Sequence, residues 1–242
     1  MKIDFCVPIY NEELILEESI SSLYSFLLSK NLPYDWRIVI VDNGSKDQSR
    51  EIANKLANEK ISLFVVNRPG RGRAIRKYWS NSDADIVSYM DADLAVNLKH
   101  VPELVGPIIQ GEAEIVIGSR LLPESVIERN IFRETISRSC NVLYRLFFGY
   151  GVNDTQCGFK AVKKSSFNDI SQYFFDDKWF FDTELITYMK YKKNRLKEIP
   201  VEWNEKRFDK RNSKVKVFKD SFNHFMNFLK LKKKIREIGE AS

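Results

Sequence analysis

The chain has 242 residues, of which 43% are hydrophobic and 30% are charged, and its formal net charge is +6. This composition is typical of a globular protein with a substantial core, and it excludes a disordered or fibrous chain. The three cysteines are widely spaced and form no CxxC pair, which argues against a disulfide framework or a zinc site and favours a reducing compartment.

The charge and hydropathy patterns narrow the class of partner. No apolar run of about 18 residues occurs, so we expect no helix that spans a bilayer. The N-terminus turns acidic within its first dozen residues, unlike a signal peptide. The basic excess favours an anionic partner, so nucleic acid, an anionic membrane and a phosphorylated ligand are candidates, beside a merely soluble basic protein.

Strand-like and helix-like segments alternate along the first 120 residues. Short apolar runs predict strands, and apolar residues recurring every three or four positions predict helices. The predicted strands are residues 3–10, 36–42, 61–66, 85–91 and 113–120. Helices are predicted at 12–29, within 43–57 with Ser45 or Asp47 as cap, near 73–81 and near 99–109. This alternation predicts an α/β fold with a mostly parallel sheet covered on both faces.

The pattern changes beyond residue 121. A long helix is predicted at 129–151, a short strand at 157–164, a helix at 180–194 and a late strand at 195–203. No repeat or low-complexity linker interrupts the chain. We therefore predict one domain over residues 1–214 and a helical C-terminal extension over residues 215–242.

The extension combines an apolar stripe with a basic cluster. The stripe consists of Phe218, Phe222, Phe225, Met226 and Leu229, and the basic residues are Lys230, Lys232, Lys233, Lys234 and Arg236. Two interpretations stay open. Either the stripe packs on the domain and the lysines are solvated, or the helix lies on an anionic membrane.

Charged side chains fall at the carboxyl ends of the predicted strands. They are Asp42, Asp91, Asp93 and Arg120. Since ligands of parallel α/β sheets bind at that edge, we expect one site there. Two aspartates separated by a single residue can offer their carboxylate oxygens to Mg²⁺ or Mn²⁺. Without a cation, the two carboxylates would repel each other. A divalent ion bridging Asp91, Asp93 and a diphosphate is the economical hypothesis, although D-x-D also arises by chance in loops.

Other motifs are excluded or weak. No GxxxxGK[ST] stretch occurs, which excludes a P-loop enzyme, and PGRGRA follows the third strand and fits the dinucleotide fingerprint poorly. Asp42 can accept a hydrogen bond from a base or ribose, and Tyr10 can stack on a base. Each residue also fits a structural role, Asp42 in a turn and Tyr10 in the core.

The chain resembles family 2 glycosyltransferases of the GT-A fold, and among them the polyprenyl-phosphate (dolichyl-phosphate) glucosyl- and mannosyltransferases. The matching stretches are VPIYNEE, VDNGSKD, GRGRAIR, MDADLA, GSR, RETISR, DTQCGFKAV, KWFFDTELI and EIPVEW. They run in the family's order from residue 7 to about residue 203. DTQCGFK, KWFFDTEL and VEW are closer to the glucosyl branch.

The resemblance implies a nucleotide-diphosphate sugar donor and a site assigned residue by residue. The residues implied to bind the nucleotide are Pro8, Tyr10, Glu12, Asp42, Arg71 and Asp91. Those implied to bind Mg²⁺ or Mn²⁺ are Asp91 and Asp93. The residues implied to be catalytic are Asp93, Asp182 and Arg120. Those implied to bind a phosphate group or the acceptor are Arg120, Arg133, Arg207, Ser213 and Lys214.

Three departures from the family pattern stand out. The late basic stretch EKRFDKRNSK has unusual spacing, so Arg211 or Lys214 competes with Arg207 for the phosphate role. Asn43 stands where many members have Asp. No membrane span is predicted, whereas several relatives carry one or more.

A lipid-phosphate acceptor fits these residues. A sugar hydroxyl needs a general base, whereas a phosphate with a second pKa near about 6 is already anionic and needs positive charge to hold it. The resemblance therefore implies an inverting, metal-dependent transfer of hexose, foremost glucose from UDP-glucose, to polyprenyl phosphate at the cytoplasmic face of a membrane.

Other hypotheses stay open at this point. They are GDP-mannose as donor, a hydroxyl acceptor in surface polysaccharide synthesis, and a catalytically silent binding module. Nucleic acid is not an expected partner, and a homodimer is left open.

Overall fold

In this computed structural model, residues 1–128, 131–204 and 217–240 are described, without the side chains of 131–137, 140 and 217–224. The strands are β1 (Lys2–Ile9), β2 (Asp35–Asp42), β3 (Ile61–Val65), β4 (Ile86–Met90), β5 (Ile115–Ser119), β6 (Val126–Glu128), β7 (Phe159–Lys163), β8 (Leu196–Pro200) and β9 (Glu202–Asn204). The helices are α1 (Leu16–Ser29), α2 (Ser49–Leu56), α3 (Arg71–Asn81), α4 (Val101–Ile109), α5 (Ile131–Phe148), α6 (Lys164–Asn168), α7 (Phe181–Tyr191) and α8 (Val217–Glu240), with short 3₁₀ turns η1 (Leu98–His100) and η2 (Ser171–Tyr173).

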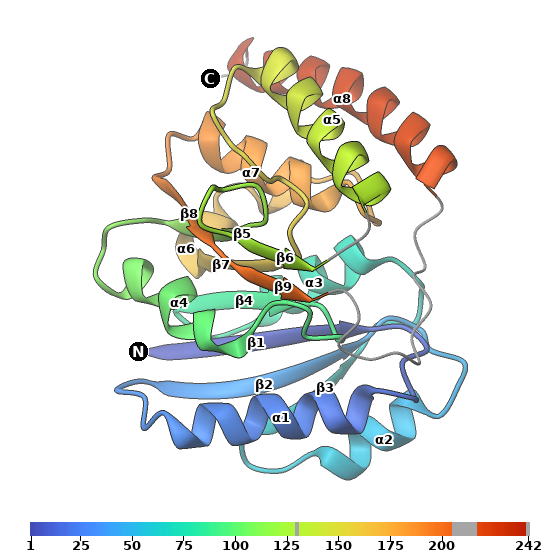
Figure 1. Cartoon of the computed structure of the whole chain (residues 1–242), viewed down its shortest axis with the longest axis vertical. Helices are drawn as coiled ribbons and strands as arrows, with labels where there is room; N and C mark the ends of the chain where they lie inside the picture. The colour runs from blue at the N-terminus through green and yellow to red at the C-terminus, as the bar shows by residue number, and fades with distance from the viewer. Residues whose placement is uncertain (129–130, 205–216, 241–242) are drawn as a thin grey trace.

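Seven strands form one sheet in the order β3-β2-β1-β4-β7-β5-β8 (Figure 1). Every neighbouring pair is parallel except the two that involve β7, which runs antiparallel to β4 and to β5. This confirms the predicted α/β class and the mostly parallel sheet. β6 and β9 form a separate parallel pair.

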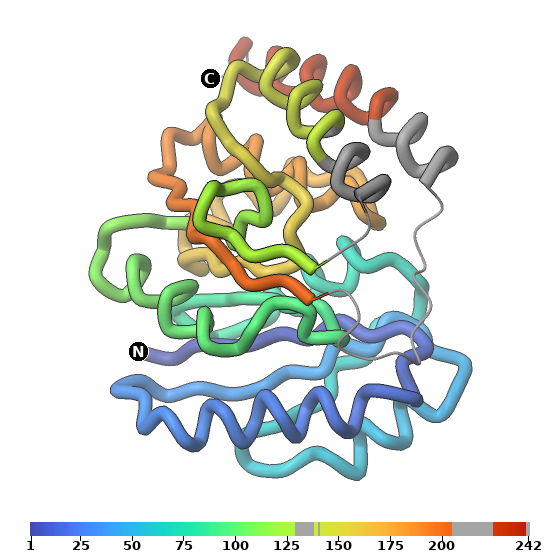
Figure 2. Tube along the Cα trace, viewed as in Figure 1, coloured from blue at the N-terminus to red at the C-terminus, as the bar shows by residue number. Residues whose placement is uncertain are grey.

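Helices cover both faces of the sheet because the strand residues alternate between two apolar cores. In β1, Phe5 and Val7 join the core formed with α1, α2 and α4, whereas Cys6 joins the core formed with α3 and α7. α5 and α8 lie side by side as an outer pair that contacts α7 (Figure 1). Figure 2 follows the chain from the N-terminus at the sheet to the C-terminal part of α8 in this outer layer.

Two local predictions were wrong. The late strand divides at Pro200, where pairing with β5 ends, and β9 joins β6 in the second sheet; proline has no N–H to continue the ladder. α2 begins after Gln48 rather than at Ser45 or Asp47, although the Asp47 carboxylate accepts the N–H of Ser49 at 3.0 Å. The predicted boundary near residue 214 lies outside the described residues, so the two-part division stays a prediction.

Candidate active site

The carboxyl ends of the parallel strands meet at one edge of the sheet, and β7 brings its amino end to the same edge. Because β7 runs antiparallel to β4, Phe159 at its start pairs with Met90 at the end of β4. Beyond this pair, the N–H of Asp91 donates to the carbonyl of Gly158 at 3.2 Å. The D-x-D pair therefore lies against the loop that precedes β7.

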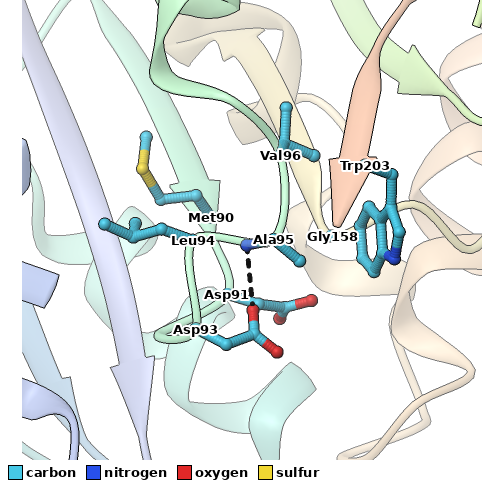
Figure 3. Close-up of a pocket in the computed structure, with 8 residues that line it drawn as sticks. All are labelled: Met90, Asp91, Asp93, Leu94, Ala95, Val96, Gly158 and Trp203. Atoms are coloured by element: carbon cyan, nitrogen blue, oxygen red, sulfur yellow. Dashed lines mark hydrogen bonds between the residues drawn. The ribbon is translucent and has the colours of Figure 1, made fainter. Parts of the chain in front are cut away.

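Asp91 and Asp93 lie in a tight turn that leaves β4. The N–H of Leu94 donates to the carbonyl of Asp91 at 3.0 Å, and Leu94 has a φ of 45°, an uncommon conformation for a residue with a side chain. Both carboxylates line one pocket, which the indole of Trp203 also lines (Figure 3). A turn, and not an extended strand, brings the two carboxylates together.

Gly158 makes room for the carboxylate of Asp91. A Cβ atom at residue 158 would fall 1.9 Å from Oδ2 of Asp91, inside any acceptable contact distance. Only glycine fits there while the carboxylate keeps its position.

The carboxylate pair fits a hard divalent cation. Within residues 1–128, 131–204 and 217–240, no group of three or more His, Cys, Asp or Glu side chains is placed to hold a metal. Mg²⁺ binds through one or two carboxylates together with substrate phosphates and water, and does not need a cage built from protein alone. The donor set of Asp91 and Asp93 suits that mode of binding.

Arg71, the first residue of α3, connects two carboxylates of the site. Its Nη2 and Nε donate to Oδ1 of Asp91 at 2.9 and 3.1 Å, and its Nη1 donates to Oδ2 of Asp182 at 2.7 Å. The guanidinium lies 4.7 Å from the ring of Tyr89 and 5.1 Å from the ring of Trp179. Burial is the largest single influence and lowers the pKa of Arg71, but Asp91, Tyr89 and Asp182 together outweigh burial, and the pKa rises. Arg71, which the sequence predicted to bind the nucleotide, is therefore paired with the carboxylates of Asp91 and Asp182.

Asp182 is buried among cations and is only 1% exposed. Lys160 Nζ donates to its Oδ1 at 2.8 Å, the hydroxyl of Tyr89 donates to the same oxygen, and Arg71 holds the other oxygen. Burial would raise the pKa of Asp182, but Lys160 and Arg71 outweigh burial and lower it. The carboxylate is therefore ionised and fully engaged.

Arg120 follows β5 and is held by Asp154. Its Nε and Nη2 donate to the two carboxylate oxygens of Asp154 at 2.7 and 3.0 Å, and its Cζ lies 4.8 Å from the ring of Trp203. Asp154 is fully buried, which alone would raise its pKa, but Arg120 outweighs burial and lowers that pKa to about 2. The guanidinium is fixed in a bidentate pair.

The predicted nucleoside residues cluster at the ends of β1 and β2. Pro8, Glu12 and Asp42 are buried, and Tyr10 is partly buried. One oxygen of Asp42 accepts the N–H of Ser45 at 2.9 Å, and the other accepts Arg50 Nε at 2.8 Å. Asp42 is thus oriented by its own loop and α2. Its role toward a nucleoside stays a prediction.

Residues 4–171 match the family described as "Glycosyl transferase family 2". The chain belongs to glycosyltransferase family 2. A solved structure of glucosyl-3-phosphoglycerate synthase from Mycobacterium tuberculosis, in complex with Mn²⁺ and UDP-glucose, is similar in fold. Its TM-score is 0.70 at 19% sequence identity, and the match covers 96% of this chain and 78% of that one. The GT-A fold prediction is confirmed.

Two curated relatives in sequence are glycosyltransferase AglD of Haloferax volcanii and a dolichyl-phosphate beta-glucosyltransferase of Trichomonas vaginalis. The first is 33% identical over 85% of this chain, and the second is 30% identical over 84% of it. The chain spans only 34% of the length of the Haloferax protein and 66% of the length of the Trichomonas protein.

Several predicted phosphate ligands of this family 2 chain lie outside what the structure describes. They are the side chain of Arg133 and residues Arg207, Arg211, Ser213 and Lys214. Their roles stay predictions.

Sequence reasoning missed residues that complete the site. They are Tyr89, Asp154, Gly158, Lys160 and Trp203. Asp154, Gly158 and Lys160 belong to the DTQCGFK stretch and Trp203 to EIPVEW. Both stretches were used only to detect the family resemblance. The place of Gly158 and Lys160 at the carboxyl edge depends on β7 running antiparallel, and that of Trp203 depends on the pairing of β9 with β6 and Val96. No local pattern indicated either arrangement.

Proposed function

We propose that this family 2 chain is an inverting glucosyltransferase that transfers glucose from UDP-glucose to a polyprenyl phosphate. The observation that carries the proposal is the pocket of Asp91, Asp93 and Trp203, where Arg71 pairs with Asp91 and Arg120 lies over Trp203. Similarity at about 30% identity to a dolichyl-phosphate beta-glucosyltransferase supports the choice of glucose and of a lipid phosphate.

In this proposal, Asp91 and Asp93 hold Mg²⁺ or Mn²⁺, and Arg120 faces a phosphate group of donor or acceptor. The bound cation supplies positive charge to the diphosphate as it leaves. A phosphate oxygen of the acceptor forms the new bond to C1 of glucose. The bond from C1 to the UDP oxygen breaks, and its electron pair leaves with UDP, which inverts the configuration at C1.

The state of Asp182 supports an acceptor that needs no general base. A hydroxyl acceptor requires a carboxylate or imidazole that can take a proton. Asp182 is ionised, but its oxygens are occupied by Lys160, Arg71 and Tyr89, and it is almost completely buried. A phosphate acceptor arrives already deprotonated. We therefore assign Asp182 to positioning Arg71 and Lys160 instead of to proton transfer.

We further propose that the chain attaches to an anionic membrane through a face formed by α5 and α8. No helix among residues 1–128, 131–204 and 217–240 is long and apolar enough to cross a bilayer. Among the described side chains of these two helices, exposed large apolar ones are present at Val142, Leu146, Phe225, Met226 and Leu229. Exposed basic residues of α8 follow them at Lys230, Lys232, Lys233 and Arg236.

For the described part of the predicted stripe, exposure favours contact with lipid over packing on the domain. Among the described side chains of α8, Phe228 and Leu231 are buried, at 1% and 0% exposure, whereas Phe225 and Leu229 are 41% and 45% exposed. The side chains of Phe218 and Phe222 lie outside the described residues. The exposed apolar side chains beside basic ones suit a lipid surface with negative charge, where a long isoprenoid acceptor would reside.

The test of the proposed function combines ligand binding with turnover. Thermal unfolding is measured with UDP, UDP-glucose, GDP and GDP-mannose, with and without Mn²⁺, and the same donors are then assayed with polyprenyl phosphate. We expect stabilisation by uridine nucleotides only with Mn²⁺, and transfer from UDP-glucose, because a ligand of the folded state raises its stability. Stabilisation by guanosine nucleotides but not by uridine nucleotides would overturn the assignment of UDP-glucose as donor. Turnover with a sugar hydroxyl but not with polyprenyl phosphate would overturn the acceptor.

A further inference from the structure

Trp203 lines the pocket of the carboxylate pair. Among the described residues of that lining it is the aromatic one, beside Met90, Asp91, Asp93, Leu94, Ala95, Val96 and Gly158. We infer that Trp203 is the platform that carries the hexosyl group of the donor. The inference rests on the proposed function and assigns a specificity-determining residue to the same site.

The backbone of Trp203 is fixed from two sides. Residue 203 pairs with Ile127 of β6 on one side and with Val96, just past the D-x-D turn, on the other. Hydrogen bonds on either side of this bridge join Asn204 N to the carbonyl of Ala95 at 2.8 Å and Asn97 N to the carbonyl of Glu202 at 2.9 Å. The ring is therefore held in register with the carboxylate turn by the backbone itself.

The side chain of Trp203 is fixed as well. The guanidinium of Arg120 lies over the ring at 4.8 Å, and Arg120 is itself held by both oxygens of the buried Asp154. A cation held over an aromatic face is attracted by the ring quadrupole and restrains the ring. Trp203 remains only partly buried, so part of the indole stays available to a ligand.

The chemistry of the pocket matches a sugar. In Figure 3 the indole of Trp203 and the carboxylates of Asp91 and Asp93 surround the same space. A hexopyranose presents C–H groups on its faces and hydroxyl donors around its rim, so an aromatic surface opposite carboxylates can contact both.

The experiment compares the dissociation constants of UDP and UDP-glucose in the presence of Mn²⁺ by calorimetry. The proteins are the unmodified chain, Trp203→Leu, Trp203→Phe and, as matched control, Trp36→Leu, a buried tryptophan near the start of β2. For Trp203→Leu we expect the ratio of the two constants to shift about tenfold against UDP-glucose, with UDP affinity unchanged. Trp203→Phe should keep the ratio within about threefold, because it retains an aromatic face.

The outcomes separate the inference from the proposed function. An unshifted ratio in folded Trp203→Leu overturns the platform, and so does an equal loss of affinity for both ligands, which indicates a structural role. Failure of the unmodified protein to bind either ligand with Mn²⁺ would instead overturn the proposed function. If Trp203→Leu does not fold, Trp203→Met, which keeps more side-chain volume but has no aromatic face, replaces it and carries the same expectation.

Discussion

Two hydrogen bonds join the guanidinium of Arg71 to one oxygen of Asp91, at 2.9 Å from Nη2 and 3.1 Å from Nε. The same guanidinium reaches Asp182 at 2.7 Å. Arg71 therefore links Asp91, which we propose binds the cation, to the buried carboxylate of Asp182. The orientation of Asp91 depends on a residue of α3 and on a residue of α7.

Replacing Arg71 with lysine tests this connection. Lysine keeps the charge but cannot span two carboxylates with a planar fork, so Asp91 loses its fixed orientation. We expect the affinity for UDP with Mn²⁺ to fall about tenfold, equivalent to about 1.4 kcal/mol. Arg68→Lys, at an exposed position two residues before Gly70, is the control and should bind like the unmodified protein. Equal affinities in both variants would show that Arg71 does not position Asp91.

The substitution Gly158→Ala tests whether Asp91 needs its observed position. The new methyl group would meet Oδ2 of Asp91 at 1.9 Å, so the carboxylate must move. We expect Mn²⁺-dependent nucleotide binding, measured by calorimetry, to be lost or weakened at least tenfold.

The matched control for that substitution is Gly106→Ala in α4, where an added Cβ meets no atom within 4 Å. Alanine is favoured over glycine in a helix by up to about 1 kcal/mol, so this variant should be as stable as the parent or more stable. Undiminished binding by Gly158→Ala would mean that Asp91 does not need its observed position.

The buried pair of Arg120 and Asp154 predicts a dependence of stability on pH. The pKa of Asp154 is about 2 in the folded chain and 3.8 ordinarily. A lowered carboxyl pKa stabilises the fold above pH 3.8, and that contribution is lost as the pH falls through about 2. The difference corresponds to about 2 kcal/mol.

The measurement is denaturant unfolding at pH 5 and pH 2 for the parent and Asp154→Asn. We expect the variant to be less stable at pH 5 by about 3–5 kcal/mol, because it leaves the Arg120 guanidinium buried without a counter-charge. The gap should narrow by about 2 kcal/mol at pH 2. Asp169→Asn, at an exposed position, should show no such narrowing. A gap that is constant with pH would argue against the lowered pKa.

The α5–α8 face predicts binding to lipid. Leu146→Glu and Leu229→Glu place a negative charge where exposed apolar side chains lie. Co-sedimentation with vesicles that contain anionic lipid should fall severalfold for each variant, because a carboxylate opposes both apolar insertion and the surface potential. Leu28→Glu on α1, which is 55% exposed on a different layer, is the control. Equal sedimentation of all three variants would assign membrane binding to another surface.

The alternation of strands and helices, the mostly parallel sheet and the family resemblance could all be predicted from the amino-acid sequence. The alternation and the sheet follow from local patterns, because the apolar runs of β1, β2, β4 and β5 are long enough to be recognised one at a time. The family was indicated separately, by the resemblance of the motif stretches. Asp91 and Asp93 were also within reach of sequence reasoning, since their position at a strand end places them at the ligand-binding edge.

The residues that surround that pair became apparent only from the three-dimensional arrangement of the strands. The antiparallel insertion of β7 between β4 and β5 brings Gly158 against Asp91 and Lys160 toward Asp182. The division at Pro200 carries Trp203 away from the main sheet and onto the D-x-D turn. Strand order and direction come from long-range packing and backbone pairing. A local pattern of hydrophobicity therefore does not predict which residues far apart in the sequence will be in contact.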